Sequence, residues 1–329
     1  VFTLCLLKAC NSPTKESRHE DSESSLPDSV LMTDLTIGLS MYTLNAPYFM
    51  AMAKSIEEHV KERGMNFIYL DAQNDMVRQV GNVEDLLARG IDLLILNPLD
   101  PHGLVLATRS ATMAGVPVII VDSSIEPGAD FITIIQSNNL RNGELVGEWL
   151  AKQMGQRNIS AALLSGAQGN PVGKERRQGI FRGIIEQQLR SLGAVHFDLV
   201  AQGWGNWTYE GGLAAMEDIL VAHSDINVLI SEQDAMALGA MQAIKEAGKE
   251  NEILVLAAAD GQKEAFEKIM QGEYGATGLN NPSLIAGMAV EIAIQVLAGE
   301  RDFPQVIYTP AACITKDNVE AFYDPEAIF

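Results

Sequence analysis

The feature that most constrains the fold is a regular alternation of short apolar runs with longer segments of helical periodicity. The stretch from Asn227 to Gly248 contains one complete unit of this kind. The run 227–230 has the length of a buried strand, polar residues follow at 231–234, and apolar residues then recur at helical spacing until Gly248. A strand that leads directly into a helix in this way is typical of α/β chains with parallel sheets.

This unit repeats along the chain in two similar halves. The first half runs from the strand at Leu35 to the strand that ends at Ile135, and the second runs from the helix at Leu140 to the strand that ends at Leu279. Two such halves predict two doubly wound parallel-sheet lobes, and a cleft between lobes is a preferred place for a small-molecule site. A helix over 283–299 and a tail over 306–329 complete the chain.

The N-terminal residues predict export from the cytoplasm. Residues 1–10 read as the end of a signal-peptide apolar region, and the residues before Cys10 resemble a bacterial lipobox, in which the cysteine is lipidated. Lys8 departs from that motif because a small residue is usual there. Residues 11–33 are rich in Ser and acidic residues, which predicts a disordered tether that would hold a lipid-anchored protein clear of the membrane. An ordinary cleaved signal is the alternative.

Composition excludes several classes of function. A net charge of −20 argues against a surface that contacts nucleic acid phosphates. The five histidines show no paired spacing and the three cysteines form no framework, so we expect neither a metal site nor a cofactor. The segment 169–175 resembles a phosphate loop only superficially, because its glycine spacing is too short and Glu175 replaces the required Ser or Thr. With no nucleophile elbow either, we expect no enzymatic activity.

Polar side chains at the predicted strand ends favour a neutral ligand with several hydroxyl groups. Amides and carboxylates at these positions can donate to and accept from neighbouring hydroxyls, Arg176 can bridge two of them, and aromatic rings can cover the C–H faces of a sugar. Each residue alone also fits a turn, core, cap or surface role. The residues concerned are Asn97, Asp122, Ser137, Gln233, Asp260 and Asn280, with Arg176 and the aromatic Tyr48, Phe49 and Trp207.

Several segments, taken together and in order, carry a family resemblance. They are 42–49 (YTLNAPYF), 94–98 (LILNP), 115–122 (GVPVIIVD), 166–179 with Glu175 and Arg176, 233–240 (QDAMALGA), 260–261 (DG) and 276–280 (ATGLN). From Leu35 to about Thr315 the chain resembles the periplasmic sugar-binding proteins of ABC transporters, of the ribose-binding-protein type. That resemblance implies the type I periplasmic binding protein fold, which LacI-type effector domains share.

The resemblance also implies how the lobes and the site are built. Residues 34–137 with 281–309 would form the N-terminal lobe, and residues 138–280 with 310–329 the C-terminal lobe, joined by a three-strand hinge near 137–138, 280–281 and 309–310. The N-terminal lobe would supply Tyr42, Tyr48, Phe49, Asn97, Asp122 and Ser137 to the ligand, and the C-terminal lobe Arg176, Trp207, Gln233, Asp260 and Asn280.

Four positions depart from the family pattern. Ala46 stands where a second Asn is common, Ser123 where an Arg usually follows the Asp, Gln233 where Asn is usual, and Ala259 where an aromatic residue often precedes Asp260. These departures make ribose itself doubtful as the ligand. A less polar and roomier pocket would suit another pentose, a hexose, a polyol or a deoxy sugar.

The resemblance implies an extracytoplasmic solute-binding protein that delivers a sugar or polyol to an ABC transporter permease. A binding protein that presents its ligand to a chemoreceptor or a membrane sensor kinase is the alternative. A LacI-type repressor needs a basic helix-turn-helix before the first strand, and here that space holds the acidic segment 11–33. We expect a monomer located in the periplasm or at the cell surface.

Overall fold

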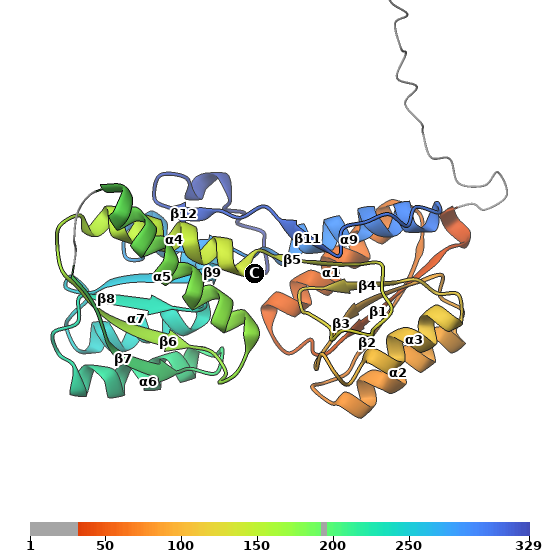
Figure 1. Ribbon diagram of the computed structural model, residues 1–329, viewed down its shortest axis with the longest axis horizontal. Coiled ribbons are helices and arrows are strands. Elements are labelled where there is room, and N and C mark those ends of the chain that lie inside the picture. Colours follow the sequence, from red (N-terminus) through yellow and green to blue (C-terminus); the bar gives the residue numbers. More distant parts are fainter. Residues whose placement is uncertain (1–31, 192–195) are drawn as a thin grey trace, which may run out of the picture.

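The computed structural model describes residues 32–191 and 196–329. Two lobes lie side by side along the long axis of the molecule, joined at a narrow waist (Figure 1). The predicted signal remnant over 1–10, its Cys10 and nearly all of the predicted tether lie outside the described residues. Within the described residues, no helix combines the length and the apolar composition needed to cross a membrane.

The N-terminal lobe is built on a six-stranded parallel sheet in the order β11-β5-β4-β3-β1-β2. The central strands are buried along their whole length because helices cover both faces of the sheet. The elements are β1 (Thr36–Met41), α1 (Pro47–Glu62), β2 (Asn66–Asp71), α2 (Met76–Ala88), β3 (Leu93–Asn97), α3 (Val105–Met113), β4 (Val118–Val121), β5 (Thr133–Ser137), α9 (Pro282–Leu297) and β11 (Val306–Thr309).

The C-terminal lobe repeats the architecture, with a sheet in the order β12-β10-β9-β8-β6-β7. Its strands are parallel except β12, which pairs antiparallel with β10. The elements are α4 (Asn139–Met154), β6 (Ile159–Ser165), α5 (Pro171–Ser191), β7 (Phe197–Trp204), α6 (Tyr209–Ala222), β8 (Val228–Ser231), α7 (Asp234–Glu246), β9 (Leu254–Asp260), α8 (Lys263–Gln271), β10 (Ala276–Leu279) and β12 (Cys313–Thr315). The predicted pair of parallel-sheet lobes is confirmed.

Two regions differ from the sequence-based expectation. The tail over 306–329 contains strands β11 and β12, one in each sheet, and ends with a short 3-10 helix over Val319–Ala321. At the other end, Thr33 was assigned to the tether, but a 3-10 helix over Met32–Asp34 includes it. The Asn66 side chain donates a hydrogen bond to the Thr33 carbonyl at 3.0 Å, which ties this residue to the lobe.

One buried side chain links all three places where the described chain passes between the lobes. These passages follow β5, β10 and β11. Asn142 in α4 is fully buried, and its Nδ2 donates to Ser137 Oγ at 3.0 Å and to the Leu279 carbonyl at 2.5 Å. Its Oδ1 accepts from the Ala312 backbone N–H at 3.2 Å. The three connections of the hinge are therefore bonded to one residue.

Helices α4 and α5 pack unusually close together because glycines face one another across their contact. A Cβ on Gly143 of α4 would lie 2.3 Å from the Arg176 carbonyl of α5, and a Cβ on Gly179 of α5 would lie 2.2 Å from the Leu140 carbonyl. Only glycine permits this approach. The contact holds Arg176 beside the first turn of α4, which begins at the hinge.

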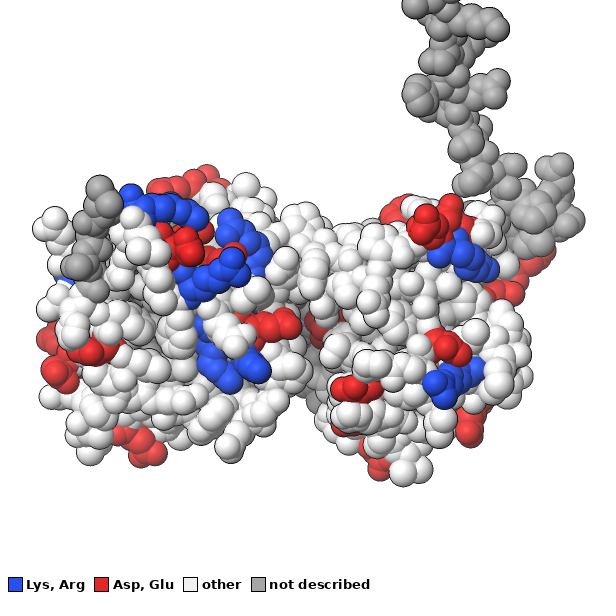
Figure 2. All heavy atoms as spheres, in the orientation of Figure 1, with Lys and Arg blue, Asp and Glu red and all other residues white. Residues whose placement is uncertain are grey.

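Basic side chains gather on one face of the C-terminal lobe, over α4 and α5 (Figure 2). Arg141, Arg182 and Arg190 are largely exposed, and they form ion pairs with Glu144 and Glu148, which are mostly covered. These two glutamates offset part of the positive charge of the three arginines. Each such exposed pair contributes about 0–1 kcal/mol to stability.

Candidate functional site

The carboxyl ends of strands from both sheets face one another across the waist and enclose a cavity of about 250 Å³. In doubly wound sheets this edge collects loop side chains and helix N-termini, so ligands bind there. Nearly all the residues predicted from the sequence line this single cavity: Tyr42, Tyr48, Phe49, Asp122, Arg176, Trp207, Gln233, Asp260 and Asn280. The two others, Asn97 and Ser137, do not line it.

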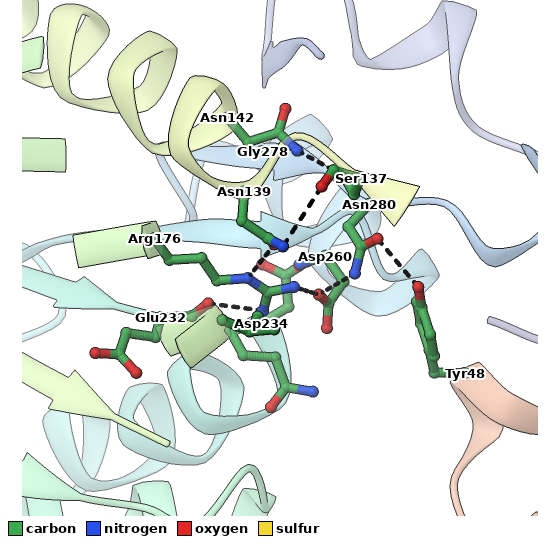
Figure 3. A network of polar contacts seen from close by, with 12 residues as sticks. Tyr48, Ser137, Asn139, Asn142, Arg176, Glu232, Asp234, Asp260, Gly278 and Asn280 are labelled. Atoms are coloured by element: carbon green, nitrogen blue, oxygen red, sulfur yellow. Dashed lines mark hydrogen bonds and ion pairs between the residues drawn. The ribbon is translucent and has the colours of Figure 1, made fainter. Parts of the chain in front are cut away.

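Arg176 is the centre of the polar network on the C-terminal side (Figure 3). It is 4% exposed, and it forms an ion pair with Asp260 at 2.7 Å. Its Nε donates to Asn139 Oδ1 at 2.9 Å and its Nη1 donates to the Glu232 carbonyl at 3.0 Å. A guanidinium carries five N–H donors, so these three bonds leave two further N–H groups. The Trp207 ring lies below the guanidinium, 5.8 Å from ring centre to Cζ.

Asp260 is held in place by its neighbours on both sides. Its Oδ1 accepts from Arg176 and, at 2.9 Å, from Asn280 Nδ2. The loop that carries it is fixed by Asp234, whose Oδ2 accepts the backbone N–H groups of Asp260, Gly261 and Gln262 at 2.7–3.0 Å. Asp234 is fully buried and does not line the cavity. Its role is to shape the loop.

Asp122 faces this network from the N-terminal lobe. It follows β4 with a φ of 65°, a left-handed conformation that Asp and Asn adopt more readily than most residues. Tyr48 donates to its Oδ1 at 2.5 Å. Burial raises the pKa of the Asp122 carboxyl to about 6, although hydrogen bonds from Tyr48 and Asn97 and the charge of Arg176 act in the opposite direction. The Arg176–Asp260 pair is balanced, so Asp122 leaves the cavity with an excess negative charge.

Aromatic rings form two walls of the cavity. Tyr42, Tyr48 and Phe49 follow β1, with ring centres of Phe49 at 4.7 Å from Tyr42 and 5.2 Å from Tyr48 in edge-to-face contacts. Trp207 covers the opposite side and packs on Gly166, where a Cβ would lie 2.0 Å from the indole. The absence of a side chain at Gly166 is therefore what allows Trp207 to reach the cavity.

Gln233 offers a hydrogen-bond acceptor that nothing in the described structure satisfies. The residue lines the cavity, and its buried Oε1 has no hydrogen-bond partner among the described residues. Buried acceptors without partners are rare because each costs about 1–3 kcal/mol. A ligand hydroxyl would satisfy this oxygen.

The two residues outside the cavity have supporting positions. Asn97 is fully buried at the end of β3, where its Nδ2 donates to the Val121 carbonyl at 3.0 Å, directly before Asp122. Ser137 ends β5, and its Oγ donates to the Leu279 carbonyl in the hinge at 3.1 Å. Both residues therefore position the backbone on which ligand-facing side chains sit.

Sequence reasoning did not identify some residues that line the cavity, namely Pro98, Leu99, Asn139, Asn170 and Val172. Asn139 and Asn170 had a recognisable signal, because each lies where a predicted strand gives way to a helix. Asn170 caps α5 by accepting the N–H groups of Val172 and Gly173. Leu99 and Val172 carried no such signal, since apolar residues in loops usually pack against the protein.

These features define the class of protein. Between the two lobes lies a small cavity whose walls combine aromatic rings with hydrogen-bonding groups that are still available to a ligand. This arrangement is typical of a two-lobed ligand-binding protein. No group of His, Cys, Asp and Glu that could hold a metal ion occurs within residues 32–191 and 196–329.

Comparison with known families agrees with that class. Residues 37–301 match the periplasmic binding protein domain, and the chain belongs to this family. Its members bind solutes outside the cytoplasm and are not enzymes. The chain is 36% identical over 302 residues to the ribose import binding protein of Bacillus subtilis, covering 92% of each chain. It is 30% identical over 266 residues to that of Escherichia coli, covering 81% of this chain and 86% of the other.

Solved structures show the same architecture. An ABC transporter periplasmic solute-binding protein from Actinobacillus succinogenes with bound D-allose is 28% identical, with a TM-score of 0.78, covering 87% of this chain and 99% of the other. A solute-binding protein from Bacillus halodurans with bound myo-inositol is 26% identical, with a TM-score of 0.78, and the match covers 90% of this chain and 98% of the other. This chain is therefore similar to proteins of sugar import.

Proposed function

We propose that the protein captures a neutral sugar or polyol between its lobes and delivers it to an ABC importer. The observation that carries this proposal is the set of hydrogen-bonding groups left unsatisfied around one cavity. Gln233 Oε1, two N–H groups of Arg176, and the second carboxylate oxygens of Asp122 and Asp260 remain for a ligand. Alternating donors and acceptors of this kind match vicinal hydroxyls.

The two lobes act as a clamp. We assign residues 34–137 with 281–309 to one lobe and residues 138–280 with 310–329 to the other. Asp122 belongs to the first, and Arg176, Gln233 and Asp260 belong to the second, so a ligand that contacts both sets stabilises the closed arrangement by its differential affinity. The closed form then docks on the permease through the lobe tips. Relatives that are named import binding proteins support this route.

Lipidation of Cys10 would anchor the protein to the membrane, with residues 11–31 as a spacer. Growth of cells with radiolabelled palmitate tests this lipidation. Label that is lost in Cys10→Ala supports the anchor, and an unlabelled protein contradicts it.

The test of ligand capture is a thermal-shift screen against monosaccharides, polyols and sugar acids. At a ligand concentration of 100 times Kd, stabilisation is about 2.7 kcal/mol, which corresponds to a Tm rise of roughly 5 °C for a protein of this size. A rise with one sugar or polyol and none with sugar acids supports the proposal. No rise across the panel would refute it.

A matched pair of variants locates the site. Gln233→Leu removes an amide from the cavity wall, whereas Gln242→Leu makes the same change on the exposed face of α7. Only the first should lower affinity, by about tenfold or more, as expected for one buried hydrogen bond. Equal affinity in both variants would place the site elsewhere. Growth of a deletion strain at micromolar concentrations of the identified sugar tests delivery, and undiminished growth would contradict it.

A further inference from the structure

The hydroxyl of Tyr48 occupies a position that a ligand hydroxyl would otherwise take. It lies 2.5 Å from Asp122 Oδ1 in its own lobe and 3.0 Å from Asn280 Oδ1 in the other lobe. Figure 3 shows Tyr48 reaching from α1 across to Asn280. Both oxygens belong to residues that line the cavity. The tyrosine therefore bridges the two halves of the site, as a bound sugar is expected to do.

This hydroxyl is fixed in place rather than free to swing aside. The Tyr48 side chain is buried, with 7% of the residue exposed. Phe49 and Phe329 contact its ring edge-to-face, each with centroids 5.2 Å away. Burial, followed by the charge of Asp122, raises the pKa of the Tyr48 hydroxyl well above its ordinary value, so the proton stays on the oxygen at neutral pH. The group is a permanent, preorganised donor.

Counting donors and acceptors shows what the tyrosine removes from the ligand's reach. The single hydrogen of the Tyr48 hydroxyl is shared between Asp122 Oδ1 and Asn280 Oδ1, and Asn280 Nδ2 donates to Asp260. On Asp122, Oδ1 accepts from Tyr48 and only Oδ2 remains. The other groups left for a ligand, on Asp260, Arg176 and Gln233, lie on the C-terminal side. A ligand hydroxyl directed at Tyr48 would have to compete with the phenol for Asp122 Oδ1 and Asn280 Oδ1.

We propose that Tyr48 is a specificity-determining residue that replaces one ligand hydroxyl, so that the preferred ligand is a deoxy sugar with a C–H group facing Tyr48. The inference rests on the proposed function, since it requires a sugar or polyol in this cavity. A parent sugar with a hydroxyl at that position meets a bulky group that already lies against Asp122 Oδ1 and Asn280 Oδ1, which penalises it. Tyr48→Phe removes the replacement hydroxyl and leaves Asp122 Oδ1 and Asn280 Oδ1 unsatisfied. The parent sugar can then donate a hydroxyl to these oxygens, whereas the deoxy sugar has no hydroxyl at that position.

A tyrosine away from the cavity provides a matched control. Tyr69 in β2 is exposed and does not line the cavity, and its hydroxyl forms no hydrogen bond to another described residue. Tyr69→Phe therefore deletes a hydroxyl without changing the site. Tyr48→Phe keeps the ring contacts with Phe49 and Phe329, and Tyr69→Phe keeps the stacking on Phe67, so both variants retain the aromatic packing.

The experiment measures Kd by calorimetry for pairs of parent and deoxy sugars with wild type, Tyr48→Phe and Tyr69→Phe. The pairs are D-ribose with 2-deoxy-D-ribose, D-glucose with 2-deoxy-D-glucose, D-galactose with D-fucose, and L-mannose with L-rhamnose. We expect the tightest ligand of the wild type to be a deoxy sugar. In Tyr48→Phe the ratio of Kd values for that pair should shift toward the parent sugar by about tenfold to a hundredfold. Tyr69→Phe should leave the ratio within about twofold.

Three results would overturn the inference. They are a fully hydroxylated sugar as the tightest wild-type ligand, a Kd ratio that Tyr48→Phe leaves unchanged, and a loss of affinity of the same factor for both members of the pair. The last would give Tyr48 a merely structural role. In all three cases a sugar binds, so the proposed function survives. Absence of wild-type binding to every sugar pair, together with no response to the polyols of the thermal-shift screen, overturns both proposals together.

Discussion

Replacing Asp122 with Asn should stabilise the ligand-free protein at neutral pH. Asp122 carries the excess negative charge of the cavity, and its φ of 65° is one that Asn also adopts, so Asp122→Asn removes the charge without straining the backbone. The amide oxygen still accepts the hydrogen bond from Tyr48. The change therefore isolates the electrostatic cost of burying this carboxylate. Ala would add backbone strain at this φ and confuse the result.

The magnitude follows from the raised pKa. A rise of the Asp122 pKa from 3.8 to about 6 is 6 − 3.8 = 2.2 units, equivalent to about 3 kcal/mol at 1.36 kcal/mol per unit. Asp122 is partly exposed to the cavity, and solvent screening reduces the expected effect to about 1–2 kcal/mol. Because the folded pKa lies above the unfolded one, the folded state binds the proton more tightly. Wild-type stability should therefore fall as the pH rises from about 4 to about 6.

Urea unfolding of the ligand-free protein between pH 4 and pH 8 checks this prediction. At pH 7.5 the Asn variant should be more stable by about 1–2 kcal/mol, and the difference should shrink toward pH 4. Asp225→Asn, at an exposed aspartate, serves as the control and should give less than about 0.5 kcal/mol at either pH. An Asn variant of unchanged stability at pH 7.5, or a difference that does not vary with pH, would refute the reasoning. The same variant should bind its sugar more weakly, since active sites often trade stability for function.

Three further substitutions test the network and the hinge. Arg176→Ala leaves the buried Asp260 carboxylate unpaired, so urea unfolding should show a loss of about 3–5 kcal/mol, and a loss below about 1 kcal/mol would contradict the buried pair. Gly166→Ala forces the Trp207 ring out of place, which should shift its fluorescence and weaken sugar binding at least tenfold; an unchanged spectrum would argue against this contact. Asn142→Ala removes hydrogen bonds at all three hinge connections and should lower stability by about 2–4 kcal/mol. It should also broaden the distance distribution that small-angle scattering gives for the ligand-free protein, and an unaltered scattering profile would contradict the role of Asn142 in the hinge.

The sequence was most informative where local pattern alone decides the structure. The alternation of apolar runs and helical segments predicted the strands and helices of both lobes within a few residues, because a parallel strand buried on both faces has a recognisable composition. These predicted strands also gave the positions of the strand ends, where the site residues lie. β11 and β12 were not predicted, because each is short and pairs with a strand far away in the sequence. Only the tertiary fold reveals them.

The site shows a similar division between what is local and what is not. Asp122 and Asp260 were identified because they follow apolar strands. Asn97 and Ser137 also lie at strand ends, yet their side chains donate hydrogen bonds to neighbouring backbone carbonyls. Successive residues of a strand point to opposite faces, so a shift of one residue decides which face a side chain reaches. The engagement of the Tyr48 hydroxyl by Asn280 depends on two residues 232 positions apart, and no pattern along the chain contains it.

The bonding of Asn142 to each passage between the lobes has a mechanical consequence. Connections that shared no partner would bend separately, and the lobes would then sample many relative tilts. Since Ser137, Leu279 and Ala312 are hydrogen-bonded to the same amide, we expect the three connections to move together when the lobes rotate. A membrane partner that senses the distance between the lobe tips would thus receive a two-valued signal, empty or occupied, with few arrangements in between.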